Sequence, residues 1–125
     1  MFPDVPFQKL LGIEIIAVAK NMAKVRLPFR PELVGCGNAF HGGALGSFLD
    51  LTGALAAWSG HDIRNGMKAA TVSMTINYLS AAQASVIAHA KAVKRGKKLI
   101  FCELSLNEET SDKTVANGTM IYLIA

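Results

Sequence analysis

The chain has 125 residues, of which 51% are hydrophobic and 18% are charged. This length suits a single domain, 1–125, and leaves no room for a cofactor domain beside a catalytic one. The apolar composition excludes an intrinsically disordered chain. Because a small core cannot hide all of the hydrophobic surface of such a chain, we expect self-association. The formal net charge of +4 favours an anionic partner.

The cysteine content and the apolar runs bear on the compartment. Cys36 and Cys102 are too few for a disulfide scaffold, so the cytoplasm is the expected location. The apolar run around Glu14 resembles a secretory signal, but this carboxylate interrupts it. The stretch 39–58 is long enough to cross a bilayer, yet Asp50 lies near its middle, where a carboxylate costs about 2.5–3.5 kcal/mol. We therefore expect neither a signal peptide nor a membrane span.

The hydrophobic pattern predicts one long helix between two groups of strands. The helix covers 42–59 and stops at Gly60, and it is apolar nearly all round, which is typical of a helix buried on most faces. Its four glycines cost helix stability, so another element must pack close to its backbone. The remaining elements are a short amphipathic segment at 6–11 and strands at 12–18, 23–27, 71–78, 85–93, 98–107 and 114–124. Together they predict an α+β fold, with an antiparallel sheet wrapped around the helix.

Alternation in the strand at 71–78 predicts one polar and one apolar face. The polar face carries the odd-numbered residues from Thr71 to Asn77, and the apolar face carries the even-numbered residues from Val72 to Tyr78. We therefore expect Thr71 to share a face with its neighbours at 73 and 75.

Asp50 is the most unusual residue of the long helix, because it is the only charged residue between Glu32 and Asp62. Aspartate is almost never fully buried without a partner. In a structural interpretation, the carboxylate reaches solvent through a gap in the packing or accepts backbone hydrogen bonds. In a functional interpretation, it acts as a general base or a nucleophile. Thr71 is either an ordinary strand threonine or a hydrogen-bond partner of Asp50 or of a nucleophilic water.

The start of the long helix is a second candidate site, at His41-Gly42-Gly43. Free backbone N–H groups and the positive end of the helix dipole can hold a developing oxyanion there, although His41 could instead serve only as a cap. Eight residues separate Gly42 from Asp50, which is about 12 Å along a helix, and His41 and Asp50 lie on roughly opposite sides. One chain is not expected to bring the two together, whereas two copies with antiparallel helices could.

The segment 91–98 carries five of the 13 basic residues across a predicted hairpin turn. Such a cluster is either a solvated hairpin tip or a phosphate site at a glycine turn. Nucleic acid fits less well, because no aromatic residues interleave with the basic ones.

No histidine or cysteine spacing indicates a metal site. Cys36 and Ser47 lack the local context of a nucleophile.

Three stretches, HGGALGSFLDLTGALAAW, TVSMTINYLSAA and RGKK, make the chain similar over almost its whole length to the PaaI-type hotdog-fold acyl-CoA thioesterases. The resemblance implies a hotdog fold, homodimers that pair into homotetramers, and hydrolysis of acyl-CoA thioesters with no metal or cofactor beyond the CoA of the substrate. By position, it assigns Asp50 as the catalytic acid, Gly42 as the backbone donor to the thioester oxygen, and His41 as a residue that organises the site. Thr71 matches a position where relatives place a hydroxyl.

The expected substrate-binding residues complete this assignment. They are Asn38, Gly43, Arg95, Gly96, Lys97 and Lys98.

Gly35 departs from the resemblance, because many relatives carry an Asn or Gln there that orients the nucleophile. Asn38 could take over this role. This departure favours an alternative function, a non-catalytic acyl-CoA-binding module. A hotdog dehydratase or hydratase is a further alternative, which the missing proline-rich loop before the helix disfavours. Trp58, Met67 and Met74 either line the acyl pocket or belong to the core or to an interface.

Overall fold

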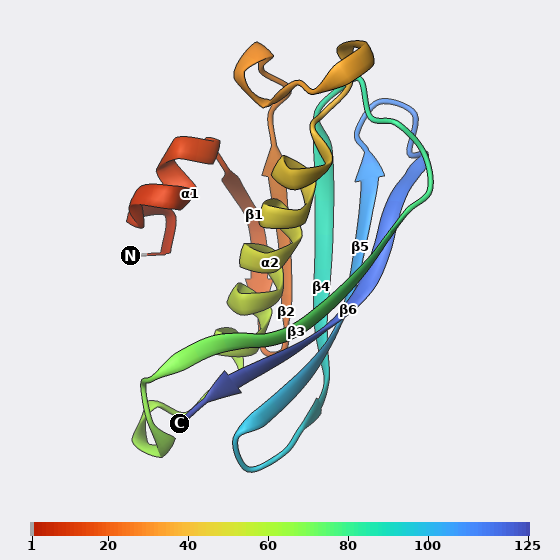
Figure 1. The fold of residues 1–125 in the computed structure, drawn as a ribbon. Helices are drawn as coiled ribbons and strands as arrows, with labels where there is room; N and C mark the ends of the chain where they lie inside the picture. The colour runs from red at the N-terminus through yellow and green to blue at the C-terminus, as the bar shows by residue number, and fades with distance from the viewer. Residues whose placement is uncertain (1) are drawn as a thin grey trace.

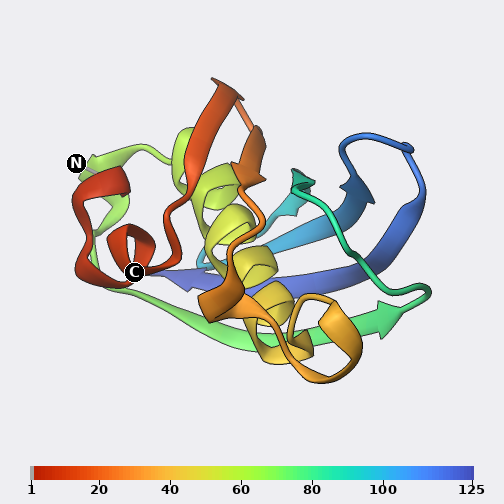
Figure 2. The ribbon, with the colours of Figure 1, turned by 90° about the horizontal axis from the view of Figure 1, so that it is seen from above.

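A computed structural model describes residues 2–125. It contains one six-stranded antiparallel sheet that curves around a single long helix, α2 (Figures 1 and 2). The strand order is β1-β2-β4-β5-β6-β3, which leaves β1 and β3 at the two edges. The main elements are α1 (Pro6–Leu11), β1 (Glu14–Ala19), β2 (Met22–Leu27), α2 (Gly42–Ser59), β3 (Ala69–Tyr78), β4 (Val86–Arg95), β5 (Leu99–Glu108) and β6 (Thr114–Ile124).

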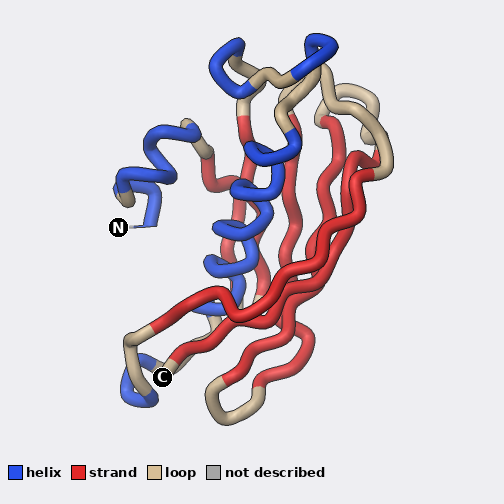
Figure 3. Tube along the Cα trace, in the orientation of Figure 1, coloured by secondary structure: helices blue, strands red, loops and turns tan. Residues whose placement is uncertain are grey.

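The predicted α+β arrangement is confirmed (Figure 3). The bounds of α2 and of β6 agree with the prediction, and the other strands agree within two residues at each end. Residues 2–125 also contain short 3-10 helices: one precedes α1, at Phe2–Asp4, and three lie in connections, at Pro31–Leu33, Cys36–Asn38 and Ile63–Asn65. In residues 2–125, no helix combines the length and the hydropathy that crossing a bilayer requires.

Helix α2 is buried because the sheet contacts it closely where its side chains are smallest. A Cβ atom on Gly53 would lie 2.9 Å from the sulfur of Met120 on β6, and one on Gly46 would lie 3.0 Å from the hydroxyl of Tyr78 on β3. The predicted close packing on the helix backbone is therefore confirmed. Thr52 is fully buried at this interface, and its hydroxyl donates to the carbonyl oxygen of Phe48 one turn earlier.

The C-terminal end of α2 is held by Arg95, the last residue of β4. Its Nη2 donates to the carbonyl oxygens of Ala56 (3.4 Å) and Ala57 (2.7 Å), and its Nε donates to Oδ1 of Asn21 (2.6 Å). Asn21 forms the β1–β2 turn with a positive φ of 66°. Burial lowers the pKa of the Arg95 guanidinium below its usual range. This side chain therefore ties the helix end to the sheet and to a hairpin turn.

Strand β3 contains a β-bulge, which the strict alternation predicted for 71–78 did not include. The register with β6 shifts between Thr71 and Ser73, so Val72 is an extra residue without a partner across the pair. A bulge re-aims the neighbouring side chain. Thr71 therefore points toward α2, as Tyr78 does, and the prediction that it shares a face with Ser73 is wrong.

Candidate active site

Asp50 lies half-buried in the middle of α2, and one of its oxygens is held in place. The hydroxyl of Thr71 donates to Oδ1 over 2.7 Å, across the gap between β3 and α2. Among residues 2–125, no group donates to Oδ2 of Asp50. One carboxylate oxygen is thus oriented, and the other is available to accept a proton or to attack a carbonyl carbon.

A cavity of about 310 Å³ opens beside Asp50, between α1, α2 and the inner face of β3 and β6. Its walls are largely apolar and include Phe7 and Trp58. The indole N–H of Trp58 donates to the hydroxyl of Tyr122 over 3.2 Å, and burial raises the pKa of Tyr122, with the nearby charge of Asp50 adding to the shift. The cavity has the composition of a small-molecule site, with apolar walls around a few placed polar groups.

Of the three residues expected to line either a pocket or the core, only Trp58 borders the Asp50 cavity. Met74 is half-buried against the hydrophobic core, on the inner face of β3. Met67 is 68% exposed in the loop before β3, so it borders neither the Asp50 cavity nor the core.

His41 is the N-cap of α2, and its side chain organises the first helical turn. Its Nδ1 accepts the N–H of Gly43 over 2.9 Å. Because Nδ1 is an acceptor, the proton of the neutral ring is on Nε2. Within the described residues, no acceptor takes the N–H of Gly42. The cap therefore leaves the Gly42 N–H free, while the Gly43 N–H is already satisfied inside the chain.

A second cavity, of about 360 Å³, lies beside the start of α2 and is bordered by Phe40, Gly42, Leu45 and Tyr78. It shares no lining residue with the cavity at Asp50. Since α2 is unbroken from Gly42 to Ser59, the two positions stay about 12 Å apart along its axis. Within one chain, the helix start and Asp50 form two half-sites that do not meet.

The loop before α2 places Gly35 directly against His41. A Cβ atom on Gly35 would lie 3.1 Å from Cα and 3.2 Å from Cδ2 of His41, and the Gly35 N–H donates to the carbonyl oxygen of Ala39 over 2.8 Å. The histidine ring therefore occupies the space beside position 35. Asn38 is exposed at the end of a 3-10 helix, with a positive φ of 57°.

The basic turn between β4 and β5 lies at the other end of α2. Lys97 and Lys98 are exposed and border a surface cavity with Asn65 and Gly96. No ion pair engages either lysine in the part of the chain that the structure describes. Arg95, by contrast, donates to the carbonyl oxygen of Ala57 at the end of α2 and is half-buried, whereas the two lysines make no such bond among the described residues.

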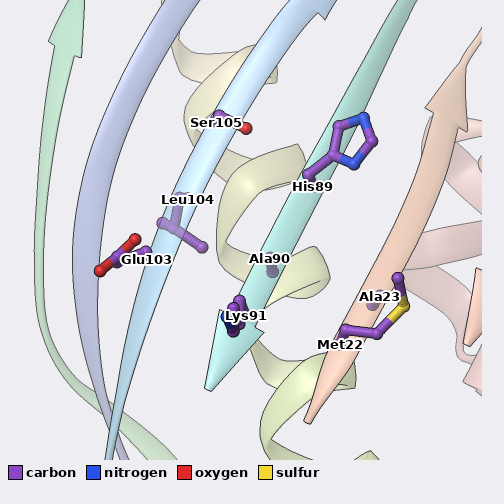
Figure 4. A pocket seen from close by; sticks show the side chains of 8 residues that line it. All are labelled: Met22, Ala23, His89, Ala90, Lys91, Glu103, Leu104 and Ser105. Atoms are coloured by element: carbon purple, nitrogen blue, oxygen red, sulfur yellow. The ribbon is translucent and has the colours of Figure 1, made fainter. Parts of the chain in front are cut away.

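A further hollow, of about 290 Å³, lies on the face of the sheet opposite α2 (Figure 4). Its rim carries Met22, His89, Lys91, Glu103 and Ser105. Burial lowers the pKa of His89, and the charge of Lys24 adds to this effect. The hollow shares no residue with either half-site. Across residues 2–125, no three metal-ligating side chains gather there or elsewhere.

Tyr78 is the residue at the helix start that the sequence pattern did not single out. Its hydroxyl donates to the carbonyl oxygen of Gly42 over 2.7 Å. The alternation of β3 indicated only that it faces the helix. The glycines at 42 and 46, one turn apart, were the available signal that a large side chain packs there.

The fold and the two half-sites define a hotdog protein, and comparison with known proteins agrees. Residues 37–114 match the model of the thioesterase superfamily, to which the chain belongs. The structure of the Escherichia coli PaaI protein from the phenylacetic acid degradation operon is similar over all of this chain and 88% of that one, with a TM-score of 0.89 and 25% identity. The chain is therefore a member of the PaaI-type hotdog thioesterase family.

Two other relatives extend the comparison. A conserved protein of Pseudomonas aeruginosa is similar over 99% of this chain and 97% of that one, with a TM-score of 0.90 and 28% identity. A protein of Saccharolobus solfataricus named "Putative esterase" is 29% identical over 101 residues, which are 80% of this chain and 70% of the relative. Four such archaeal relatives match over 62 to 70% of their own length.

Proposed function

We propose that this protein hydrolyses acyl-CoA thioesters to the free acid and CoA. Membership in the thioesterase superfamily supports thioester hydrolysis in general. The observation that carries the proposal is the Asp50 carboxylate, which Thr71 orients at the side of a largely apolar cavity. A cavity that only bound an acyl chain would gain nothing from a half-buried carboxylate, because such a group costs desolvation free energy.

In the proposed reaction, the free oxygen of Asp50 takes a proton from a water molecule, which attacks the thioester carbonyl carbon. The C=O electron pair moves to oxygen, where the Gly42 N–H stabilises the negative charge. When the oxyanion re-forms the C=O bond, the C–S bond breaks, and CoA leaves as the thiolate and takes the proton back from Asp50. Alternatively, Asp50 attacks the carbonyl carbon directly, and water then hydrolyses the anhydride. Neither route uses a metal or a redox cofactor.

The proposed site needs two chains, and we propose that they pair through β3, an edge strand of the sheet. β3 is a ten-residue strand that lies at an edge of the sheet and is paired on one side only (Figure 2). Val72 on this strand is 54% exposed. Thr71 on this strand contacts Asp50, and Tyr78 contacts Gly42. Antiparallel pairing of β3 with a second copy would therefore bring Gly42 of one chain toward Asp50 of the partner subunit. A homodimer is thus part of the proposal, and a homotetramer would pair two such dimers.

The nucleotide end of CoA is proposed to bind at the β4–β5 turn. Lys97 and Lys98 are exposed and have no ion-pair partner among the described residues, so they can attract phosphates. Gly96 lies at this turn, and its N–H donates to the carbonyl oxygen of Leu99.

Release of free thiol from a panel of short-chain, long-chain and aryl acyl-CoAs tests the proposal. We expect turnover of at least one class, and a loss of about 10²- to 10⁴-fold in kcat for Asp50→Asn, the usual contribution of general-base catalysis. Asp112→Asn is the matched control, because Asp112 is exposed, lies at the β5–β6 turn and has a positive φ that Asn tolerates.

Two outcomes would overturn the proposal. An Asp50→Asn protein that keeps more than about a tenth of the wild-type rate would remove Asp50 from the mechanism. Tight acyl-CoA binding without thiol release from any substrate would instead establish the alternative of a binding module, which Gly35 favours.

A further inference from the structure

We propose that Tyr78 is a positioning residue for His41, acting through the peptide group between Gly42 and Gly43. The expected change in kcat rests on the proposed function, whereas the expected effect on the His41 ring does not. It concerns a side chain that touches neither Asp50 nor the Gly42 N–H.

The contacts form one continuous chain of hydrogen bonds. The Tyr78 hydroxyl donates to the carbonyl oxygen of Gly42 over 2.7 Å, and the N–H of the same peptide group, that of Gly43, donates to Nδ1 of His41 over 2.9 Å. A donor on the carbonyl polarises the peptide and makes its N–H a stronger donor. Tyr78 therefore strengthens the bond that fixes the His41 ring and keeps its proton on Nε2.

Helix α2 leaves space for the hydroxyl group of Tyr78. Gly46 lies one turn after Gly42, and a Cβ atom there would come within 3.0 Å of the Tyr78 hydroxyl oxygen. The next atom, of Ile76, is 3.8 Å away. Among the described residues, the only close obstacle to a Cβ atom at position 46 is thus the hydroxyl oxygen itself. Gly46 makes room for the group that donates to Gly42.

The other side of the His41 ring is held by packing. Gly35 lies against Cδ2, and the His41 backbone N–H donates to the carbonyl oxygen of Leu33 over 2.8 Å. Nδ1 is therefore the ring atom that sets the tautomer, and Nε2–H is the group that the exposed ring presents at the start of α2. Loss of the Tyr78 bond would loosen this arrangement without removing any group from the half-site.

The first experiment compares Tyr78→Phe with the wild type and with Thr75→Val. Thr75→Val is the matched control, because it removes a hydroxyl from an exposed position of the same strand. The ¹⁵N shifts of the histidine rings are measured at about pH 8.5, two units above the ordinary histidine pKa, where the neutral tautomers are distinguished. A His41→Gln variant assigns the signals, and His61 and His89 serve as internal references.

We expect Tyr78→Phe to move the His41 signals away from the pure Nε2–H tautomer and to lower kcat about tenfold, with KM changed less than twofold. Thr75→Val should leave the His41 signals unchanged. Unchanged His41 shifts in Tyr78→Phe, or equal shifts in Thr75→Val, would overturn the inference. Because this readout needs no substrate, it decides the link between Tyr78 and His41 even if no acyl-CoA is hydrolysed.

A double-mutant cycle with Gly46→Ala tests the same link from the helix side. Alone, Gly46→Ala should displace the hydroxyl and shift the His41 signals as Tyr78→Phe does. In the Tyr78→Phe background, which lacks that oxygen, it should add no further change. Additive effects would overturn the inference, and this cycle also covers the case in which one single variant folds poorly by circular dichroism.

Discussion

At the scale of single residues, different side chains orient the groups of the two half-sites on α2. Thr71 fixes one oxygen of Asp50, and His41 caps the helix so that the Gly42 N–H stays free. Neither Thr71 nor His41 belongs to an ion pair among the described residues. Single short hydrogen bonds, rather than charges, therefore orient the groups of the candidate site.

Thr71→Val tests this orientation, because valine keeps the shape of threonine and removes the hydroxyl. We expect kcat on an active acyl-CoA to fall about tenfold, the equivalent of one hydrogen bond, with little change in KM. Thr71→Ser should retain most of the rate. Steady-state kinetics measure both, and a Thr71→Val protein with wild-type kcat would show that Asp50 needs no such partner.

The role of Thr71 was only partly predictable from the sequence. Its type and its place near the start of a strand suggested a hydrogen bond to Asp50. The strict alternation of β3 placed it on the wrong face, because nothing in the residue types marks Val72 as the extra residue of a bulge. The bulge is set by pairing with β6, which is a long-range contact that local periodicity does not contain.

At the scale of elements, helix α2 depends on partners at both ends. His41 supplies the N-cap, and Arg95 satisfies carbonyl groups in the last turn. The apolar periodicity and Gly60 predicted the bounds of α2, since these are local signals. The capping role of Arg95 was not predictable, because it requires β4 to end beside the last turn of a helix that lies far away in sequence.

Arg95→Met should lower the free energy of unfolding by about 1–2 kcal/mol, because it removes the donors to Ala56 and Ala57 while keeping the aliphatic stem. Denaturant unfolding measures the change. KM for acyl-CoA should stay within about twofold, and a large rise in KM at unchanged stability would show instead that Arg95 binds substrate phosphate.

Lys97→Gln with Lys98→Gln gives the opposite pattern if these side chains hold the CoA phosphates. KM should rise and lose part of its salt dependence, while kcat and stability change little, because both residues are exposed. A truncated thioester without the nucleotide is the control substrate. If its KM rises equally, the lysines do not act on the phosphates.

Glu108, the last residue of β5, makes stability depend on pH. Its carboxylate accepts the Gln83 N–H (3.0 Å) and the Ser111 hydroxyl (2.8 Å), and the first of these bonds is the main reason that the pKa of Glu108 is lowered from 4.5. A lowered folded-state pKa gives stability that is complete above about pH 4.5 and is lost as pH falls through the lower value.

We therefore expect the wild type to lose more stability than Glu108→Gln does between pH 5 and pH 3, with a difference on the order of 1 kcal/mol. Urea unfolding curves at several pH values measure this. Parallel curves for the two proteins would contradict the proposed role of Glu108 in acid sensitivity.

At the scale of the whole molecule, α2 separates the proposed oxyanion donor from the proposed base. The distance of about 12 Å followed from the sequence alone, because it depends only on helix geometry. The strand proposed to pair in the dimer was not predictable, since the sheet order that leaves β3 at an edge comes from tertiary pairing. The central claim is therefore that each active site combines the start of one α2 with Asp50 of the partner subunit.

The most direct test mixes two inactive variants, Gly42→Pro and Asp50→Asn. Proline at position 42 removes the N–H and fits the chain, because Gly42 is the first helical residue and His41 has an extended ψ of 133°. Gly42→Ala, which keeps the N–H and has room for its methyl group 3.9 Å from Tyr78, is the matched control. Circular dichroism and subunit labelling establish that the variants are folded and exchange.

In each mixed dimer, one site carries both changes and the other carries neither, so random exchange of equal amounts should restore about a quarter of the wild-type activity. Sites built within single chains would each retain one lesion. If the folded and exchanging variants regain no activity on mixing, the shared site is wrong.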